Sequence, residues 1–159
     1  MAFDVGDRVV YPHHGAAIIT RKETRDAFGE PAEYLVLEML HGDLVLSVPT
    51  GKAEQVGMRP PISPSDVEDL FGVIAKRDVR EPSNWSRRFK NHQEKMKSGD
   101  VYQVAEVVRN LALRETAKGL STAEKAMLER ARSILVSELS FALEVSEEDA
   151  RQRLDRALV

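Results

Sequence analysis

The sequence predicts an α+β protein in two parts: a small, strongly curled β-barrel over residues 1–60 and a compact all-α domain over residues 61–159. Three observations predict this arrangement. Short β-branched and aromatic runs, separated by glycine and proline turns, fill the first sixty residues. Pro60, Pro61 and Pro64 then interrupt the pattern. After these prolines, apolar residues recur at helical spacing behind helix-capping residues.

The front part contains about five predicted strands. The runs are Arg8–Tyr11, Ala16–Thr20, Thr20–Arg25, Glu33–Leu40 and Leu44–Val48. A turn at Phe28–Pro31 predicts a hairpin, and a turn at His41–Asp43 leads into the last strand. So many short strands in so short a span favour a barrel of the SH3 or Tudor type. Because a domain of about 60 residues is marginally stable alone, we expect it to pack partly against the helices.

Five helices are predicted in the back part, each from a capping residue followed by periodic apolar positions. The expected starts are Ser65 with Glu68, the region of Ser83, Asp100 with Gln103, Ser121 with Glu124, and Ser146 with Asp149. Gly119 is expected to end the third helix. The short loops between these helices predict a compact helical domain.

Composition excludes several classes of protein. The 159 residues include no cysteine, which excludes a disulfide scaffold, a thiol nucleophile and every cysteine-based metal site. The first residues carry acids and a glycine rather than a signal sequence, and no run approaches ~18 apolar residues. We therefore expect a cytoplasmic protein with no membrane partner.

Positive charge is concentrated in one internal stretch. Residues 81–132 carry eleven Lys and Arg against seven Asp and Glu, a net charge of +4, although the whole chain has a net charge of −3. The flanking regions are acidic: residues 1–60 and 133–159 each have a net charge of −3. Such a local excess indicates an anionic partner more directly than the overall balance does.

The histidines give little support to catalysis. The chain has His13, His14, His41 and His92, and no H-x-x-x-H, H-E-x-x-H, G-x-S-x-G or P-loop pattern. Adjacent residues on a strand point to opposite faces, so His13 and His14 are poorly placed to share a metal. We expect turn histidines bonded to nearby backbone, and a protein that is not an enzyme and has no metal or cofactor.

Trp85, the only tryptophan, lies in the most unusual segment, Glu81–Lys90. On a helix, Trp85 and Phe89 share a face and Arg88 lies beside them. The residues alone leave two interpretations open, a core anchor with a solvated basic flank or an exposed contact. An apolar wedge flanked by arginines is typical of minor-groove intercalation. Lys125, in the first turn of its helix, is a weaker candidate for contacting an anion.

Several long motifs carry a family resemblance. They are Gly6–Ala17, Glu33–Leu37, Gly42–Leu44, Glu81–Arg88, Lys97–Asp100 and Gly119–Ser121. In these motifs the chain closely resembles the CarD/CdnL family of bacterial transcription regulators, particularly its actinobacterial members, over almost its whole length. The resemblance implies a Tudor-like RNA polymerase-interacting domain over residues 1–60 and a helical DNA-contacting domain over residues 61–159.

The resemblance also implies partners and site residues. The front domain would bind the RNA polymerase β subunit, in the holoenzyme with the housekeeping σ factor, through Arg25 and the position of Ser47. The helical domain would lie on promoter DNA at the upstream edge of the transcription bubble, where the tryptophan wedges into the minor groove and stabilises the open complex. The predicted DNA-binding residues are Trp85, Arg87, Arg88, Lys90 and Lys125. We expect a monomer, held near the nucleoid through polymerase.

One position departs from the family. Some relatives carry arginine where this chain has Ser47, and serine cannot form that ion pair. Either docking is weaker here, or Arg8, Arg21 or Lys22 replaces it. Two other classes remain open from the residues: a protein-binding adaptor whose helices only scaffold the barrel, and a small enzyme that uses His13 or His14.

Overall fold

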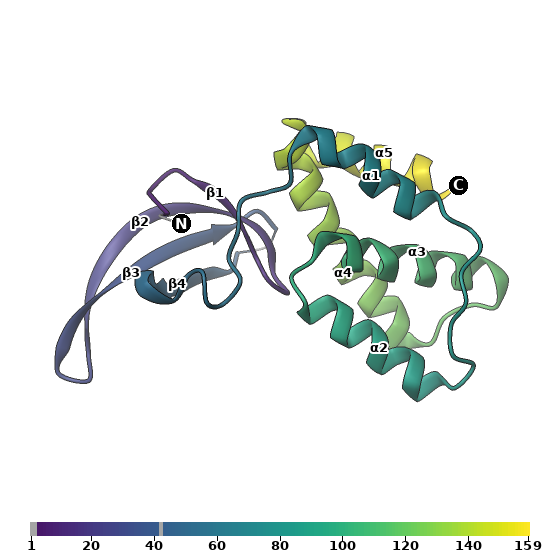
Figure 1. Cartoon of the computed structure of the whole chain (residues 1–159), viewed down its shortest axis with the longest axis horizontal. Helices are drawn as coiled ribbons and strands as arrows, with labels where there is room; N and C mark the ends of the chain where they lie inside the picture. The colour runs from purple at the N-terminus through teal and green to yellow at the C-terminus, as the bar shows by residue number, and fades with distance from the viewer. Residues whose placement is uncertain (1–2, 42) are drawn as a thin grey trace.

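The computed structural model describes residues 3–41 and 43–159, as a curved antiparallel sheet followed by five helices (Figure 1). The strands are β1 (Arg8–Tyr11), β2 (Gly15–Ala27), β3 (Glu30–Met39) and β4 (Val45–Pro49). They pair in chain order to form an open half-barrel, and a short 3₁₀ helix, η1 (Thr50–Lys52), follows β4. This confirms the predicted order of a β-rich front and a helical back.

The described sheet has four strands, not the five expected, because two predicted runs form one long strand. Ala16–Thr20 and Thr20–Arg25 are both parts of β2. The pairing with β3 shifts between Ile19 and Arg21, so Thr20 is an extra residue that bends the strand rather than ending it. The turn predicted at His41–Asp43 includes Gly42, which lies outside the described residues.

The sheet buries one apolar face. Alternating residues of a strand point to opposite faces, and the inward set forms a separate hydrophobic cluster. Its members are Phe3, Val9, Ala17, Ile19, Leu35, Leu37, Met39, Val48, Ala53 and Met58. On the opposite face, the second half of β2 carries the charged residues Arg21, Glu23 and Arg25.

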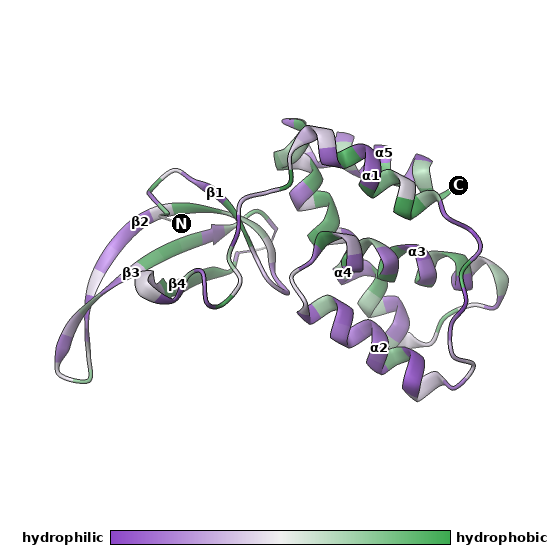
Figure 2. Ribbon diagram, in the orientation of Figure 1, coloured by the Kyte–Doolittle hydropathy of each residue, from purple (hydrophilic) through white to green (hydrophobic). Residues whose placement is uncertain are grey.

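Five helices form the back part, in agreement with the prediction. They are α1 (Pro64–Ala75), α2 (Trp85–Lys97), α3 (Val101–Ala117), α4 (Thr122–Leu143) and α5 (Glu147–Leu158). The central helices α3 and α4 supply most of the second hydrophobic cluster. Helix α2 is hydrophilic over most of its surface (Figure 2) and buries only Arg88, His92 and Met96. It is therefore a peripheral helix whose outer side faces solvent.

Most of the predicted helix ends are confirmed. Ser121 and Glu124 form the expected capping box, and Asp100 and Ser146 cap α3 and α5 through their side chains. Gly119, at φ +81°, closes the end of α3 by donating its N–H to the Arg114 carbonyl.

The expected capping box at Ser65 is wrong. Helix α1 begins two residues earlier, with Ser63 as its N-cap and Pro64 as the first helical residue. Proline suits this position because it has no N–H to satisfy and its φ is already helical. The Ser63 hydroxyl donates to the Asp66 carboxylate at 3.0 Å.

The turn between β1 and β2 packs directly on α4. The Ser137 hydroxyl accepts the backbone N–H of Ala16 at 3.0 Å and donates to the Ile134 carbonyl at 2.7 Å. Gly15 precedes this contact at φ +95°, and a Cβ there would lie 2.8 Å from Ser137 Oγ and 3.3 Å from Ile134 Cα. Only glycine permits so close an approach of strand to helix.

A buried ion pair forms the second joint between the two parts. The Arg59 guanidinium donates both terminal nitrogens to the Glu138 carboxylate, at 2.7 and 2.8 Å. The backbone N–H of Ile62 also donates to this carboxylate, at 2.9 Å. Arg59 Nε donates to the Gly99 carbonyl at 3.1 Å, so the arginine links the end of the barrel, α4 and the turn before α3.

We predict that Gly15→Ala destabilises the protein much more than Gly29→Ala. Both glycines have positive φ, so alanine at either position costs about 1 kcal/mol in backbone strain. At Gly15 the new methyl group also overlaps Ser137 and Ile134, which adds roughly 2 kcal/mol. Gly29 has nothing within 4 Å of its Cβ position, so it is the matched control. Urea unfolding measures the difference, and equal losses for the two variants would contradict this account of the joint.

Candidate nucleic-acid and polymerase surfaces

Trp85 is the first residue of α2, and the local sequence fixes that position. Asn84 is the N-cap, and its side-chain oxygen accepts the backbone N–H of Arg87 at 3.0 Å. Asparagine is among the best N-cap residues because its carbonyl satisfies a free N–H of the first turn. The indole therefore projects from the helix end, as expected, and its residue is 42% exposed.

The indole is both anchored and exposed, so each interpretation of Trp85 describes one part of it. Its ring stacks on Phe89 with centroids 4.9 Å apart and an interplanar angle of 9°. Its Nε1–H donates to Glu124 Oε1 at 3.1 Å and to Ser121 Oγ at 3.3 Å. Two directional contacts to α4 and one stacked ring hold the indole in one orientation at the surface.

Glu124 is the buried centre of this arrangement, with a side chain only 2% exposed. One carboxylate oxygen accepts from Trp85 and Ser121, and the other lies 3.5 Å from Arg88 Nε and 3.9 Å from Arg114 Nε. Burial raises the pKa of this carboxyl. The hydrogen bonds from Ser121 and Trp85 and the charge of Arg88 lower the pKa, and together they outweigh the effect of burial. The net pKa is below its ordinary value, so Glu124 is ionised at neutral pH.

Arg88 does not lie on the surface. Its residue is 2% exposed, its Nη1 donates to the carbonyls of Pro82 and Ser83, and its Nε lies between Glu81 at 4.0 Å and Glu124 at 3.5 Å. The prediction that Arg88 contacts DNA therefore does not fit this structure. We assign it instead to holding the segment before Trp85.

The sequence contained a signal for this burial. Arg88, His92 and Met96 recur every four residues and are the three buried positions of α2. By contrast Arg87, Lys90 and Lys125 are exposed. Lys125 directly follows Glu124 on α4, the helix that anchors the indole. The predicted DNA surface thus reduces to one oriented indole and three exposed cations.

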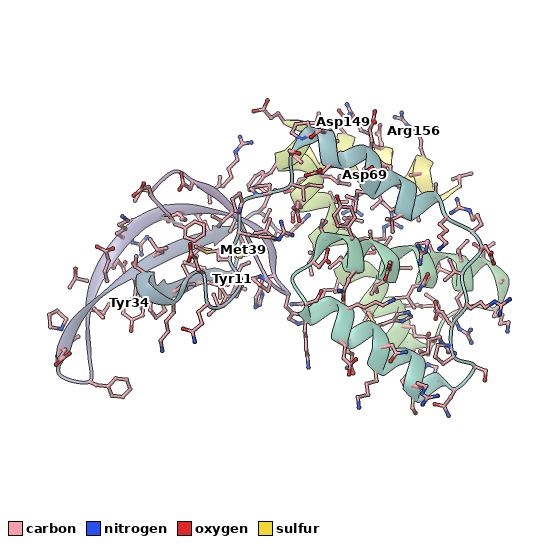
Figure 3. The ribbon with its side chains drawn as sticks, viewed as in Figure 1. Tyr11, Tyr34, Met39, Asp69, Asp149 and Arg156 are labelled. Atoms are coloured by element: carbon pink, nitrogen blue, oxygen red, sulfur yellow. The ribbon has the colours of Figure 1, made fainter. Side chains whose placement is uncertain are left out.

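The predicted polymerase residues share one face of the sheet. Arg21 pairs with Val36, and Val36 pairs with Ser47 in the next strand. Directly paired residues of antiparallel strands point the same way, as do residues two apart on one strand. Arg25 therefore lies on the same face as Ser47, and its guanidinium stands 5.4 Å from the centroid of the Tyr34 ring. Figure 3 shows Tyr34 on the part of the sheet that is far from the helices.

Of the three residues considered as substitutes for an arginine at Ser47, Arg21 and Arg8 lie on this face by the strand register, and Arg21 is the one that lies beside Ser47. Lys22 points to the opposite face and pairs with Asp4 at 3.2 Å. Arg8 is turned toward the helices, with its guanidinium 4.9 Å from the centroid of the Phe141 ring. The register places Arg21 in the same row as Ser47, with Val36 between them.

His13 and His14 lie in the turn between β1 and β2, not on a strand. The turn was expected, but the two rings do not point to opposite faces as they would on a strand. Their centroids are 5.8 Å apart, edge to face. Burial and then the charge of Arg130 lower the pKa of both, and the Arg130 guanidinium donates to the His13 carbonyl at 2.8 Å. Within residues 3–41 and 43–159, no group of three His, Asp or Glu residues could hold a metal ion.

Comparison with known proteins identifies the family. The profile of the CarD C-terminal domain matches residues 69–155, and that of the CarD-like/TRCF RID domain matches residues 3–62. The chain belongs to the CarD family. A CarD-family relative, YdeB of Bacillus subtilis (strain 168), named as a candidate transcription factor, is 30% identical over 149 residues, which cover 94% of this chain and 97% of that protein.

A solved CarD structure is also among the matches. The solution NMR structure of the 72-residue N-terminal domain of Myxococcus xanthus CarD is 29% identical, covers 37% of this chain and 79% of that chain, and has a TM-score of 0.33. Membership of the CarD family assigns this chain to transcription regulation through interaction with RNA polymerase. No helix in the described part of the chain is long and apolar enough to cross a membrane.

We predict that Glu124→Gln loosens the indole and lowers stability by about 2 kcal/mol, because buried Arg88 loses its closest charge partner. Since the folded pKa of Glu124 lies below its ordinary value of 4.5, the carboxylate contributes fully above that pH. Its contribution is lost as the pH falls through the folded pKa. Fluorescence of Trp85, the only tryptophan, should report this acid transition in the wild type and lose it in the variant.

Glu129→Gln is the matched control for this experiment. Glu129 lies on the same helix, but its side chain is 69% exposed and its ion pair with Arg151 measures 4.0 Å. Removing such a surface pair costs no more than about 1 kcal/mol. An unchanged acid transition in Glu124→Gln would show that Trp85 does not sense this carboxylate.

Proposed function

We propose that this protein binds the RNA polymerase β subunit through its front sheet and stabilises the promoter open complex by wedging Trp85 into the minor groove at the upstream edge of the bubble. One observation carries the proposal: an exposed indole is held in a single orientation by Phe89 and by buried Glu124. An aromatic side chain fixed in this way loses little rotational freedom when it enters a base step.

The exposed cations supply the other half of the wedge chemistry. Inserting a side chain between bases costs unstacking energy, which contacts to the flanking phosphates offset. Arg87, Lys90 and Lys125 are exposed and available for those phosphates. With about three phosphate contacts, the logarithm of the binding constant would fall against that of salt with a slope near −3.

Tethering explains how an acidic protein acts on DNA. Three contacts give only weak, sequence-independent affinity, with a dissociation constant on the order of 10⁻⁴ M. Bound to polymerase, the helical domain meets promoter DNA at an effective concentration on the order of millimolar. This concentration exceeds the dissociation constant, so the wedge site stays mostly occupied. Polymerase binding brings the protein to the promoter, and the tryptophan stabilises the open complex there.

In this proposal residues 1–60 form the polymerase-interacting domain and residues 61–159 the DNA-contacting domain. The sheet face that carries Arg21, Arg25 and Ser47 is the docking face, and an acidic surface of the β subunit is its partner. The protein acts as a monomer, without a cofactor, and is held near the nucleoid only through polymerase.

We predict that Trp85→Ala retains polymerase binding and shortens open-complex lifetime at least about fivefold, since stacking of one base on an aromatic ring contributes about 1–3 kcal/mol. Trp85→Phe keeps an aromatic ring without the Nε1 donor and should give an intermediate lifetime. Challenge of preformed open complexes with a competitor measures the lifetime. An alanine variant that protects open promoters as well as the wild type would rule out the wedge.

We predict that Arg25→Glu and Arg21→Glu each weaken binding to polymerase about tenfold, because each places an acid on the proposed docking face. Lys22→Glu is the matched control: it makes the same charge change on the neighbouring residue, but on the opposite face of the sheet. Association is measured with purified β subunit at two salt concentrations. Equal weakening in all three variants would indicate long-range charge rather than this face.

We further predict that Ser47→Arg tightens polymerase binding several-fold. Ser47 is exposed on an edge strand in the same row as Arg21, so an arginine there adds positive charge without disturbing the core. The added charge is needed on this face because Glu23 pairs with both Arg21 and Arg25. The same β-subunit assay measures the gain. Unchanged or weaker binding would show that Arg21 does not need reinforcement, or that the docking face lies elsewhere.

A further inference from the structure

A cavity of about 450 Å³ lies between residues 77–83 and the C-terminal half of α3. This volume is within the range of small-molecule sites. The wall formed by residues 77–83 ends just before Asn84 and Trp85, at the start of α2. The cavity is thus next to the indole but separate from the exposed cations of the proposed DNA surface.

The charged lining of the cavity is mainly positive. Arg77, Arg114 and Lys118 line it, and Glu81 is the one acid among its described lining residues. One Glu81 oxygen makes no hydrogen bond but lies 3.5 Å from His92 Nε2 and 4.0 Å from Arg88 Nε, two groups that do not line the cavity. Three cations therefore share a concave site in which their charge is little compensated, and such a site concentrates anions.

The N–H donors of these three cations lack close carboxylate partners. Arg114 Nε is buried without a hydrogen bond, and its nearest acidic oxygen, on Glu124, is 3.9 Å away. Arg77 donates to the carbonyls of Ile74 and Ala157, so its charge is not neutralised. In the described part of the chain, Lys118 has no carboxylate within ion-pair distance. Phosphate oxygens are the acceptors that such a set of donors fits best.

The remaining wall is partly apolar, with Ser83 and Asn110 as its polar members. Val79 from the connecting segment and Leu113 and Ala117 from α3 line the cavity beside the cations. A ligand that satisfies both parts carries phosphates at one end and a flat, weakly polar ring at the other. We propose that this cavity binds a nucleotide, with its phosphates on Arg77, Arg114 and Lys118 and its base against the apolar part of the wall.

A ligand bound in the cavity would change the surroundings of the Trp85 side chain. Arg88 Nη1 donates hydrogen bonds to the carbonyls of Pro82 and Ser83, and both of these residues line the cavity. A phosphate on Arg114 also draws that guanidinium away from Glu124, whose other oxygen holds the indole. A nucleotide in the cavity therefore changes the environment of Trp85 without touching it.

Titration of the full-length protein with ATP tests the proposal, with calorimetry and Trp85 fluorescence as readouts. We expect saturable one-to-one binding and a matching fluorescence change. Pyrophosphate alone and adenosine alone should each bind more weakly than ATP, because each satisfies only one part of the cavity. Lys118→Gln and Arg77→Gln should each weaken ATP binding roughly tenfold, the effect of losing one charge-assisted contact.

Arg80→Gln is the matched control, because Arg80 is exposed on the same connecting segment but does not line the cavity. Absence of saturable ATP binding would overturn the proposal. So would equal weakening by Arg80→Gln, since that result indicates diffuse electrostatic attraction. Displacement of ATP by forked DNA, with DNA binding weakened to the same extent by Lys118→Gln, would make the cavity part of the DNA surface and overturn it as well. The assay does not depend on polymerase, so it is independent of the proposed function.

Discussion

The buried Glu138 carboxylate is the constraint on which the geometry of the molecule depends. A carboxylate that is 2% exposed is costly unless its oxygens are satisfied, and here two Arg59 nitrogens and the Ile62 N–H satisfy them. Because the bidentate pair is directional, it sets the angle between the sheet and the helices as well as holding them together. The hydroxyl of Ser137, the preceding residue, accepts a hydrogen bond from the backbone N–H of Ala16 in the sheet.

Helix α4 transmits this constraint to the indole. It carries Glu138 where it meets the sheet and Glu124 where it meets Trp85, fourteen residues apart. That separation corresponds to about 21 Å along a continuous helix. Both acids are buried and both hold a group from another element. The sheet and the indole are therefore both held by α4, so in the proposed complex the docking of the sheet determines where the indole lies.

Local features of the fold could be predicted from the sequence, whereas contacts between distant residues could not. The Ser121–Glu124 capping box and the hairpin of β2 and β3 follow from short-range patterns. The pairing of Arg59 with Glu138 spans 79 residues and leaves no periodic trace. Arg88 was misassigned because its chemistry suggested DNA, although its spacing to His92 and Met96 indicated burial. The positive charge of Arg88 was given more weight than its place in the buried row of the helix.

The same contacts explain why such a wedge would not read DNA sequence. The only polar group of an indole is its Nε1–H donor, and in Trp85 that donor is directed inward to Glu124 and Ser121. The exposed part of the ring is hydrocarbon, which stacks on any base and distinguishes among bases poorly. Base recognition in the minor groove requires a donor or acceptor directed outward. By binding the donor internally, Glu124 orients the indole and leaves it no outward donor, so in the proposed mechanism the choice of promoter is left to polymerase.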